Sequence, residues 1–261
     1  MRRVESPHNE RLREVARLVA SSHERRKSGR CVLEGAHLVG VYAERIGPPQ
    51  TLVVLDDARA RPDVHALLQR VPASRTFVVT RKLFAEVATM PADVGILAVV
   101  ATPRVAPPPA ADFCLLLEDV QDPGNVGSII RTAAAAGVAQ VLMSKHCAFA
   151  WSPKVLRAAQ GAHFLTTIVE DVDLVLWARS FRDGGGRLLA AVVDAATTIY
   201  DADFRGRAAM AMGSEGRGLS AALRDLADAR VAIPMAGGSE SLNVGAAAAV
   251  VLFEAVRQRR A

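Results

Sequence analysis

From residue 113 onward, short apolar runs alternate with segments whose apolar residues recur at helical spacing. Strands that are apolar along their whole length need cover on both faces, and helices between successive strands favour parallel pairing. The pattern therefore predicts an α/β domain built on a parallel sheet. The predicted strands are 113–118, 140–143, 165–169, 187–193, 208–213 and 230–235, and the predicted helices are 124–137, 153–162, 172–182, 219–227 and 243–258.

The first hundred residues predict a smaller α/β unit of the same kind. Its predicted helices are 8–26, 36–44, 63–71 and 81–88, and its predicted strands are 31–35, 51–56, 76–80 and 95–100. Residues 102–112 follow, and their four prolines disfavour both a helix and a central strand. We therefore predict an N-terminal domain over 1–101, a proline-rich linker over 102–112 and a C-terminal domain over 113–261.

Basic residues are concentrated in the front half of the chain. Residues 1–105 hold 17 Lys and Arg against 11 Asp and Glu, whereas residues 106–261 hold 15 against 16. The first 30 residues hold nine basic and four acidic side chains, a pattern that suits contacts with phosphates. A solvated helix face remains the alternative. The candidate RNA-binding residues here are Arg11, Arg25, Arg26, Lys27 and Arg30.

Several classes of protein are disfavoured. No long uncharged apolar run or secretory signal is visible, so we expect a cytoplasmic protein that does not enter a membrane. Cys31, Cys114 and Cys147 are scattered, and the histidines show no ligand spacing, so we expect neither a disulfide framework nor a metal site. Both the Gly-x-Gly-x-x-Gly fingerprint and the phosphate-binding P-loop are missing, which disfavours a dinucleotide or nucleotide site of those kinds.

Ligands bind beyond the carboxyl ends of the strands in such sheets, and the stretch 117–138 follows one of them. It passes through Asp-Pro-Gly-Asn into a helix, and Arg131 is the only charged residue from 123 to 144. A lone guanidinium on an apolar helix must reach solvent, form a buried ion pair or serve a ligand. Asn125 is either a helix cap or a direct participant.

Two further loops are rich in small residues. In 211–220, Gly213, Gly216 and Gly218 surround Ser214 and Glu215, and glycines allow backbone to approach a ligand closely. In 233–256, glycines follow a strand, and an alanine-rich helix begins after Ser239, Ser241 and Asn243, which can cap it. A helix-start turn and a capped buried helix are the purely structural alternatives.

Taken in order, "DPGNVGSIIRTAAAAGV", "AMGSEGRGLS" and "IPMAGGSESLNVGAAAAV" resemble the three motifs of the SPOUT RNA methyltransferases, in the TrmH (SpoU) branch that methylates ribose 2′-hydroxyls. The resemblance covers about 113–259, and the front half is more loosely similar to the ribosomal-protein-like substrate-binding domain of many such enzymes. It implies a trefoil knot, a homodimer and S-adenosyl-L-methionine as cofactor. The chain departs from the pattern only in having Ala136 where an aromatic residue is common.

The resemblance also implies the site residues. The implied catalytic residues are Arg131, Asn125, Glu215, Ser241 and Asn243, with Arg131 also contacting RNA. The implied cofactor-binding residues are Gly213, Ser214, Glu215, Gly216, Gly218, Ile233, Met235, Ser241, Leu242 and Asn243. No metal is implied. The transfer is an in-line displacement that needs alignment of the reacting atoms and loss of the hydroxyl proton.

The resemblance favours 23S ribosomal RNA as the substrate, because a separate front domain is more typical of the ribosomal RNA enzymes. Three alternatives stay open at this point. The first is methylation of transfer RNA by an enzyme of the same family, and the second is a knotted RNA-binding dimer without catalysis. A small-molecule dehydrogenase is the third and is disfavoured by the missing phosphate fingerprint.

Overall fold

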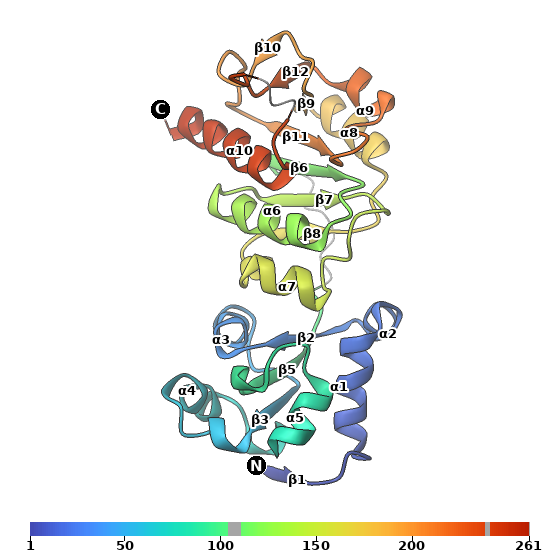
Figure 1. The fold of residues 1–261 in the computed structure, drawn as a ribbon. Coiled ribbons are helices and arrows are strands. Elements are labelled where there is room, and N and C mark those ends of the chain that lie inside the picture. Colours follow the sequence, from blue (N-terminus) through green and yellow to red (C-terminus); the bar gives the residue numbers. More distant parts are fainter. Residues whose placement is uncertain (104–110, 238–240, 261) are drawn as a thin grey trace. The chain divides into compact units, whose positions relative to one another are not determined.

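The computed structural model of the chain describes residues 1–103, 111–237 and 241–260 (Figure 1). The described residues form two compact units. The first holds Met1–Pro103 and Trp151–Phe164, and the second holds the described residues of Arg104–Ala150 and Leu165–Ala261. Most of the predicted linker lies outside the described residues, and the predicted domain boundaries stay a prediction.

The first unit is a mixed sheet with helices on both faces. Its strands are β1 (Arg2–Val4), β2 (Arg30–Glu34), β3 (Thr51–Leu55), β4 (Thr76–Val79) and β5 (Ile96–Ala101), and its helices are α1 (Glu10–Ala20), α2 (Ser22–Ser28), α3 (Ala36–Arg45), α4 (Pro62–Arg70), α5 (Arg81–Val87) and α7 (Pro153–Ala159). The strand order is β1-β4-β3-β5-β2, and β5 runs antiparallel to both of its neighbours. Figure 1 shows α1 and α5 on one face and α3 and α4 on the other. The predicted α/β architecture is confirmed, except that β1, which is mostly arginine, was not expected.

The helix predicted over residues 8–26 is two helices, which corrects that prediction. The chain bends at Ser21, whose backbone is extended and whose side chain caps α2. Arg25 is buried in the bend, where its guanidinium donates hydrogen bonds to the carbonyl oxygens of Leu18 and Val19 at the end of α1. Residues 21–30 hold no apolar side chain, so apolar periodicity gives no information on where the first helix ends.

The segment Trp151–Phe164 is far from the rest of the first unit in sequence, yet it belongs to that unit. Its helix α7 packs against β2. The ring of Phe164 meets the ring of Tyr42 edge-on, with 5.2 Å between the ring centroids. Arg157 Nη1 donates to Thr89 Oγ1 at 2.9 Å. The first unit is therefore complete only when this segment is in place.

The second unit is a parallel sheet. Its strands are β6 (Phe113–Glu118), β7 (Gln140–Met143), β8 (Thr167–Val169), β9 (Arg187–Ala191), β10 (Thr197–Thr198), β11 (Ala208–Gly213) and β12 (Ala229–Ala232). They follow the order β10-β12-β9-β11-β6-β7-β8, and every neighbouring pair is parallel. The predicted parallel sheet is confirmed. β9 and β12 end earlier than predicted, and the residues after them turn into loops.

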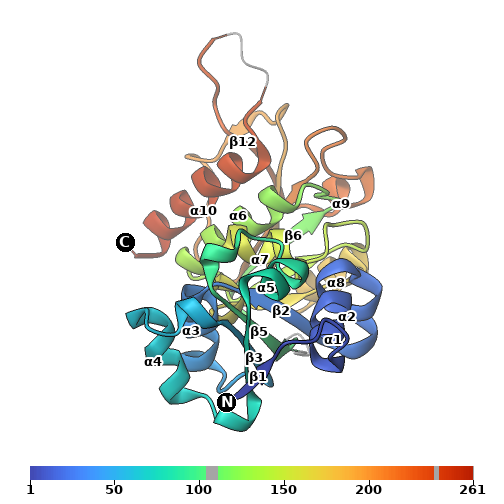
Figure 2. The ribbon, with the colours of Figure 1, turned by 60° about the horizontal axis from the view of Figure 1, so that its bottom comes forward.

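Helices cover both faces of this sheet, as predicted from its apolar strands. The helices are α6 (Pro123–Ala135), α8 (Leu174–Asp183), α9 (Ala221–Leu226) and α10 (Val244–Arg260). Figures 1 and 2 show α10 alongside α6. A Cβ atom on Gly245 would lie 2.7 Å from Ser128 Oγ, so glycine at this position allows the close approach of the two helices. The trefoil knot stays a prediction.

Candidate functional site

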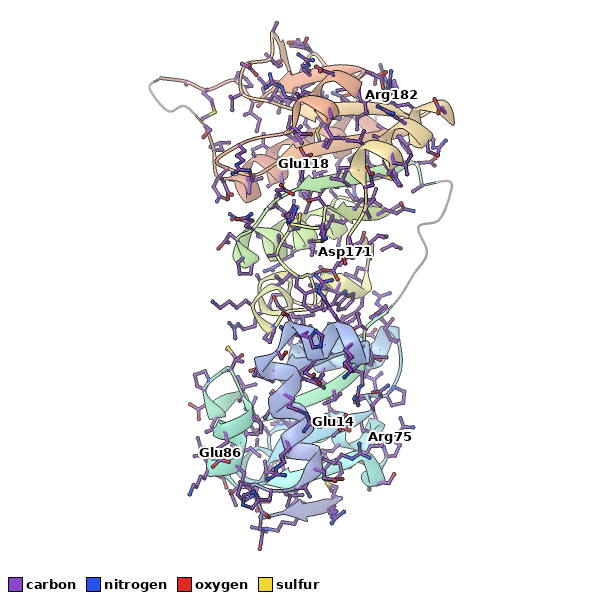
Figure 3. All side chains as sticks on the ribbon, turned by 90° about the vertical axis from the view of Figure 1, so that its right-hand side faces the viewer. Glu14, Arg75, Glu86, Glu118, Asp171 and Arg182 are labelled. Carbon is purple, nitrogen blue, oxygen red and sulfur yellow. The ribbon has the colours of Figure 1, made fainter. Side chains whose placement is uncertain are left out.

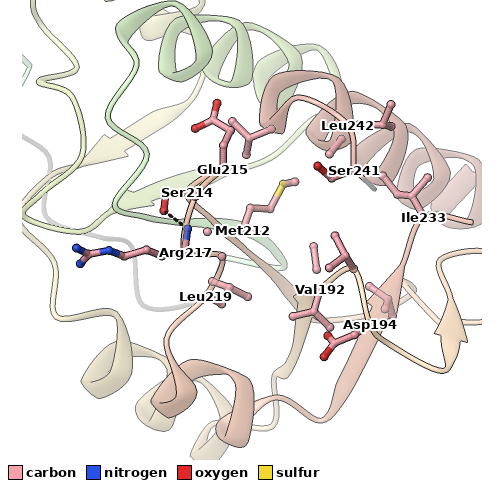
Figure 4. Close-up of a pocket in the computed structure, with 18 of the residues that line it drawn as sticks. Val192, Asp194, Met212, Ser214, Glu215, Arg217, Leu219, Ile233, Ser241 and Leu242 are labelled. Carbon is pink, nitrogen blue, oxygen red and sulfur yellow. Dashed lines mark hydrogen bonds between the residues drawn. The ribbon is translucent and has the colours of Figure 1, made fainter. Parts of the chain in front are cut away.

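A cavity of about 460 Å³ lies at the carboxyl edge of the second sheet (Figure 4). Its walls come from loops after three neighbouring strands, β9, β11 and β12, and from the start of α10. Because parallel strands present their carboxyl ends at one edge, residues distant in sequence meet there. The lining residues are 191–194, 212–219, 224, 231, 233, 235, 241, 242, 244 and 247.

The glycine-rich loop after β11 closes tightly on itself. Gly218 donates its amide to the carbonyl oxygen of Ser214 at 2.9 Å. A Cβ atom on Gly213 would lie 2.1 Å from the backbone carbonyl of Gly218, far inside any contact that real side chains make. Gly218 itself has φ +65°, a conformation that favours glycine. The shape of the loop therefore requires glycine at 213 and favours glycine at 218.

A carboxylate from the neighbouring strand fixes the far end of the same loop. Glu118, labelled in Figure 3, is the last residue of β6 and lies opposite Gly213 in the sheet. Its Oε2 accepts a hydrogen bond from the amide of Ser220 at 2.6 Å. Ser220 in turn caps α9 through Leu223. The loop is thus attached at its start by the sheet and at its end by a charged acceptor.

Asn125 connects the two cavity loops to helix α6. Its Nδ2 donates to Glu215 Oε1, and its Oδ1 accepts from Asn243 Nδ2 at 3.0 Å. Asn243 also caps α10, because its Oδ1 accepts from the amide of Gly245 at 2.9 Å. The cap of α6 is Asp122, whose carboxylate accepts a hydrogen bond from the backbone N–H of Asn125. The alternative in which Asn125 serves as the cap therefore does not hold.

Arg131 lies two turns further along α6 and is exposed. No described residue forms a hydrogen bond or an ion pair with its guanidinium. Arg131 also does not line the cavity. The alternative of a buried ion pair therefore does not hold. A guanidinium is permanently charged and offers several donors, so this exposed group is available to an anionic ligand.

The structure brings most of the predicted cofactor residues together. Nine of the ten line the cavity, and Asn243 adjoins it through Leu242 and Val244. Ser239, which we predicted as a possible cap, lies outside the described residues. The sequence reasoning missed residues 192–194, which follow β9 and also line the cavity. The rule that ligands lie beyond strand ends applied to them equally, but they lack the small residues that marked the other loops.

Four of the five predicted RNA contacts at the N-terminus are at least partly exposed, namely Arg11, Arg26, Lys27 and Arg30. Arg11 and Arg30 both form ion pairs with Glu14, which lies on α1 and is labelled in Figure 3. Arg25 is buried and is occupied by the end of α1, so its position does not fit the predicted phosphate contact.

Burial disfavours the thiolate form of all three cysteines. Burial raises the pKa of the Cys31 and Cys114 thiols to about 12, and it also raises the pKa of Cys147. Within residues 1–103, 111–237 and 241–260, no three His, Cys, Asp or Glu side chains are grouped so as to hold a metal ion. In the same described ranges, no helix has the length and apolar character needed to cross a bilayer.

The chain is similar to known methyltransferases along nearly its whole length. The model of the SpoU rRNA Methylase family matches residues 112–253. An uncharacterized tRNA/rRNA methyltransferase of Synechocystis sp. is 35% identical over 90% of this chain and 86% of its own length. The 23S rRNA (guanosine(2553)-2′-O)-methyltransferase RlmP of Bacillus subtilis is 30% identical over 97% of this chain and 98% of its own. The structure of the SpoU methyltransferase AviRb from Streptomyces viridochromogenes, in complex with AdoMet, aligns with a TM-score of 0.86 at 30% identity, over 97% of this chain and 99% of that one.

Proposed function

This chain belongs to the SpoU rRNA methylase family, and on that premise we propose that it transfers a methyl group from S-adenosylmethionine to a ribose 2′-hydroxyl of 23S ribosomal RNA. The similarity to the Bacillus subtilis 23S rRNA enzyme extends over both units of the chain. The observation that carries the proposal is the convergence of two small-residue loops, distant in sequence, on one cavity next to Asn125.

The cavity fits this cofactor in size and chemistry. Its volume of about 460 Å³ is in the usual range for small-molecule sites. Met212, Leu219 and Leu242 offer apolar walls for a base, and the glycine loop exposes backbone groups for polar parts of the ligand. When bound, the cofactor supplies an activated methyl group on a sulfonium. The residues that would hold it are 213–218, 233, 235 and 241–243.

Asn125 and its two partners act together in orienting the site. The carboxylate of Glu215 is held by Asn125, so we assign Glu215 to fixing the glycine loop and not to removing a proton. Asn243 holds the start of α10 and the end of the loop that precedes it. Ser241 lines the cavity and offers a hydroxyl to the ligand. Alignment of reacting groups by such contacts is a large part of catalysis in a displacement reaction.

Arg131 binds the phosphate next to the target ribose and stabilises the negative charge that develops on the hydroxyl oxygen. Its exposure and its lack of a partner among the described residues support this role. A guanidinium stays protonated in proteins, so Arg131 is not the base. The hydroxyl proton passes to that phosphate or to a water molecule.

The N-terminal domain, residues 1–101, binds the RNA through its basic surface, with Arg11, Arg26, Lys27 and Arg30 as contacts. Residues 102–112 link it to the methyltransferase domain, residues 113–261. The enzyme acts as a homodimer in the cytoplasm, where ribosomes are made, and a second subunit completes the RNA site. The names of the bacterial relatives, which are 23S rRNA 2′-O-methyltransferases, support ribosomal RNA as the substrate.

The proposal is tested by mapping ribose methylation in total RNA from cells with and without the gene. One methylated nucleotide of 23S rRNA is expected to disappear with the gene and to return with the wild-type copy, but not with Arg131→Ala. Disappearance of a methylated transfer RNA nucleotide would replace the ribosomal substrate. No change in either RNA, with calorimetry showing no binding of S-adenosylmethionine by the purified protein, would overturn the enzymatic function.

A further inference from the structure

Asp194 places a second carboxylate in the cavity wall. It follows strand β9 and lines the cavity, as does Glu215 after β11. Figure 4 shows the two carboxylates on opposite sides of Met212. Glu215 is occupied by Asn125 Nδ2, whereas Asp194 receives two long hydrogen bonds from a single nitrogen, Arg224 Nη2, which lies 3.4 Å from its Oδ1 and 3.3 Å from its Oδ2. The cavity therefore has two distinct ends, and one of them carries a carboxylate with spare acceptor capacity.

The cavity wall around Asp194 combines Arg224 with apolar residues. Val192 and Val193 precede it, and Leu219 and Val231 also line the cavity. Flat apolar groups such as a purine base suit such walls. In a nucleoside, the vicinal ribose hydroxyls lie within a few bonds of the base. The end of the cavity that accommodates the base therefore also receives these hydroxyls.

We propose that Asp194 is the residue that recognises the ribose hydroxyls of the adenosine part of the cofactor. This inference rests on the proposed function, since it concerns the same cavity. An ionised carboxylate is acceptor-only and can take a hydrogen bond on each oxygen, which matches two neighbouring hydroxyl donors. Carboxylates at the ends of parallel strands bind ribose hydroxyls in the same way in dinucleotide folds.

The amino-acid end of the cofactor is the other charged or polar group that Asp194 could meet. Binding of that zwitterion would pair its ammonium with Asp194 and its carboxylate with Arg224, and it would have to open the existing ion pair. Hydroxyl groups can instead donate to Asp194 while Arg224 stays in place, because each carboxylate oxygen has more than one acceptor position. The position of Arg224 thus favours the ribose.

The test is equilibrium binding without catalysis. Calorimetry measures the affinity of S-adenosylhomocysteine, of its 2′,3′-dideoxy analogue and of 5′-methylthioadenosine, which lacks the amino-acid group. Hydrogen bonds to a charged acceptor predict that Asp194→Ala weakens S-adenosylhomocysteine and 5′-methylthioadenosine by about tenfold or more, and leaves the dideoxy analogue unchanged. Asp194 is largely exposed, with 67% of its side-chain surface accessible, so the variant is expected to fold.

Asp225→Ala is the matched control. Asp225 is also an exposed carboxylate held by an arginine, here Arg230 at 2.8 Å, but it does not line the cavity. It is expected to leave all three affinities unchanged. Equal weakening of the dideoxy analogue by Asp194→Ala, or weakening confined to S-adenosylhomocysteine, would overturn the assignment to ribose. Absence of S-adenosylhomocysteine binding by the wild type would overturn the proposed function itself.

Discussion

Asn243 Nδ2 donates a hydrogen bond to Asn125 Oδ1 at 3.0 Å, although the two residues are 118 positions apart in the chain. The same Asn125 side chain donates to Glu215, so one amide links the first helix of the second unit to two cavity loops. An amide has both a donor and an acceptor end, and an aspartate at this position would lose the donor and face the carboxylate of Glu215.

Asn125→Ala is expected to lower the rate of methyl transfer by about tenfold or more, because the loss of two side-chain hydrogen bonds loosens the alignment of the site. Single-turnover kinetics on a 23S rRNA fragment measure this rate. Asn9→Ala is the control, since Asn9 caps α1 in the first unit and its loss lowers stability without touching the cavity. An unchanged rate in Asn125→Ala would show that the connection is not needed for transfer.

Arg131→Ala is expected to lower turnover by more than tenfold, a barrier increase above about 1.4 kcal/mol, while the affinity for S-adenosylmethionine stays nearly the same. The guanidinium does not line the cavity, which is why cofactor binding survives. Steady-state kinetics and calorimetry on the same preparation separate the two effects. Arg179→Ala removes an exposed arginine from α8 and serves as the charge control. More than a tenth of wild-type turnover in Arg131→Ala would remove Arg131 from the mechanism.

Gly213→Ala is expected to reduce the free energy of unfolding by about 2 kcal/mol or more, since the added Cβ atom would overlap the backbone of Gly218. Urea denaturation measures the change. A Cβ atom on Gly216, in the same loop, would have no atom within 4 Å, so Gly216→Ala is expected to be nearly neutral for stability. Equal stability of the two variants would contradict the tight closure of the loop.

Replacement by alanine is expected to affect RNA binding at Lys27 and folding stability at Arg25. Lys27 is exposed, so its loss should weaken RNA binding and reduce the slope of log affinity against log salt by about one. Arg25 is buried against the end of α1, so its loss should lower stability by about 1–3 kcal/mol. Filter binding at several salt concentrations and thermal melts distinguish the two. A salt slope unchanged by Lys27→Ala would exclude that residue from the RNA surface.

Glu254 makes the stability of the second unit depend on pH in the acid range. The hydrogen bonds from Arg257, and to a lesser extent from Gln258, hold the pKa of this buried carboxyl below its usual range. A lowered folded-state pKa contributes stability above the unfolded value of about 4.3, and the contribution is lost as pH falls through the folded value. Glu254→Gln should therefore be less stable than the wild type at pH 7, and the difference should shrink as pH falls through the folded-state pKa of Glu254. A difference that is constant with pH would contradict this account.

The strands and helices were largely predictable because apolar period and turn residues determine them locally. The boundary between α1 and α2 and the short strand β1 were not predicted. Ser21 ends one helix and starts another in a polar stretch where no apolar pattern marks the boundary, and Arg25 satisfies the carbonyl groups at the bend. β1 was missed because Arg2 and Arg3 are exposed on an edge strand, where charged residues are tolerated.

The parts of the site that are rich in small residues could be predicted from the sequence. Gly213 is needed for a close backbone contact and Gly218 suits a positive φ, and the clustering of glycines in this loop is visible in the sequence. Asp194 was missed, since nothing in "VVD" distinguishes a cavity wall from the end of any buried strand. The partners of Asn125 were also beyond prediction, because a hydrogen bond between loops depends on the packing of whole helices.

The segment Trp151–Phe164 constrains the order in which the protein can fold during its synthesis. During translation, the first hundred residues leave the exit tunnel long before the piece that finishes their unit. The ring of Tyr42 cannot pack against Phe164 until two strands of the second sheet, β6 and β7, have also left the ribosome. The first unit therefore cannot complete its folding before synthesis of the second unit has begun. Its packing stays incomplete until residues 151–164 have been synthesised.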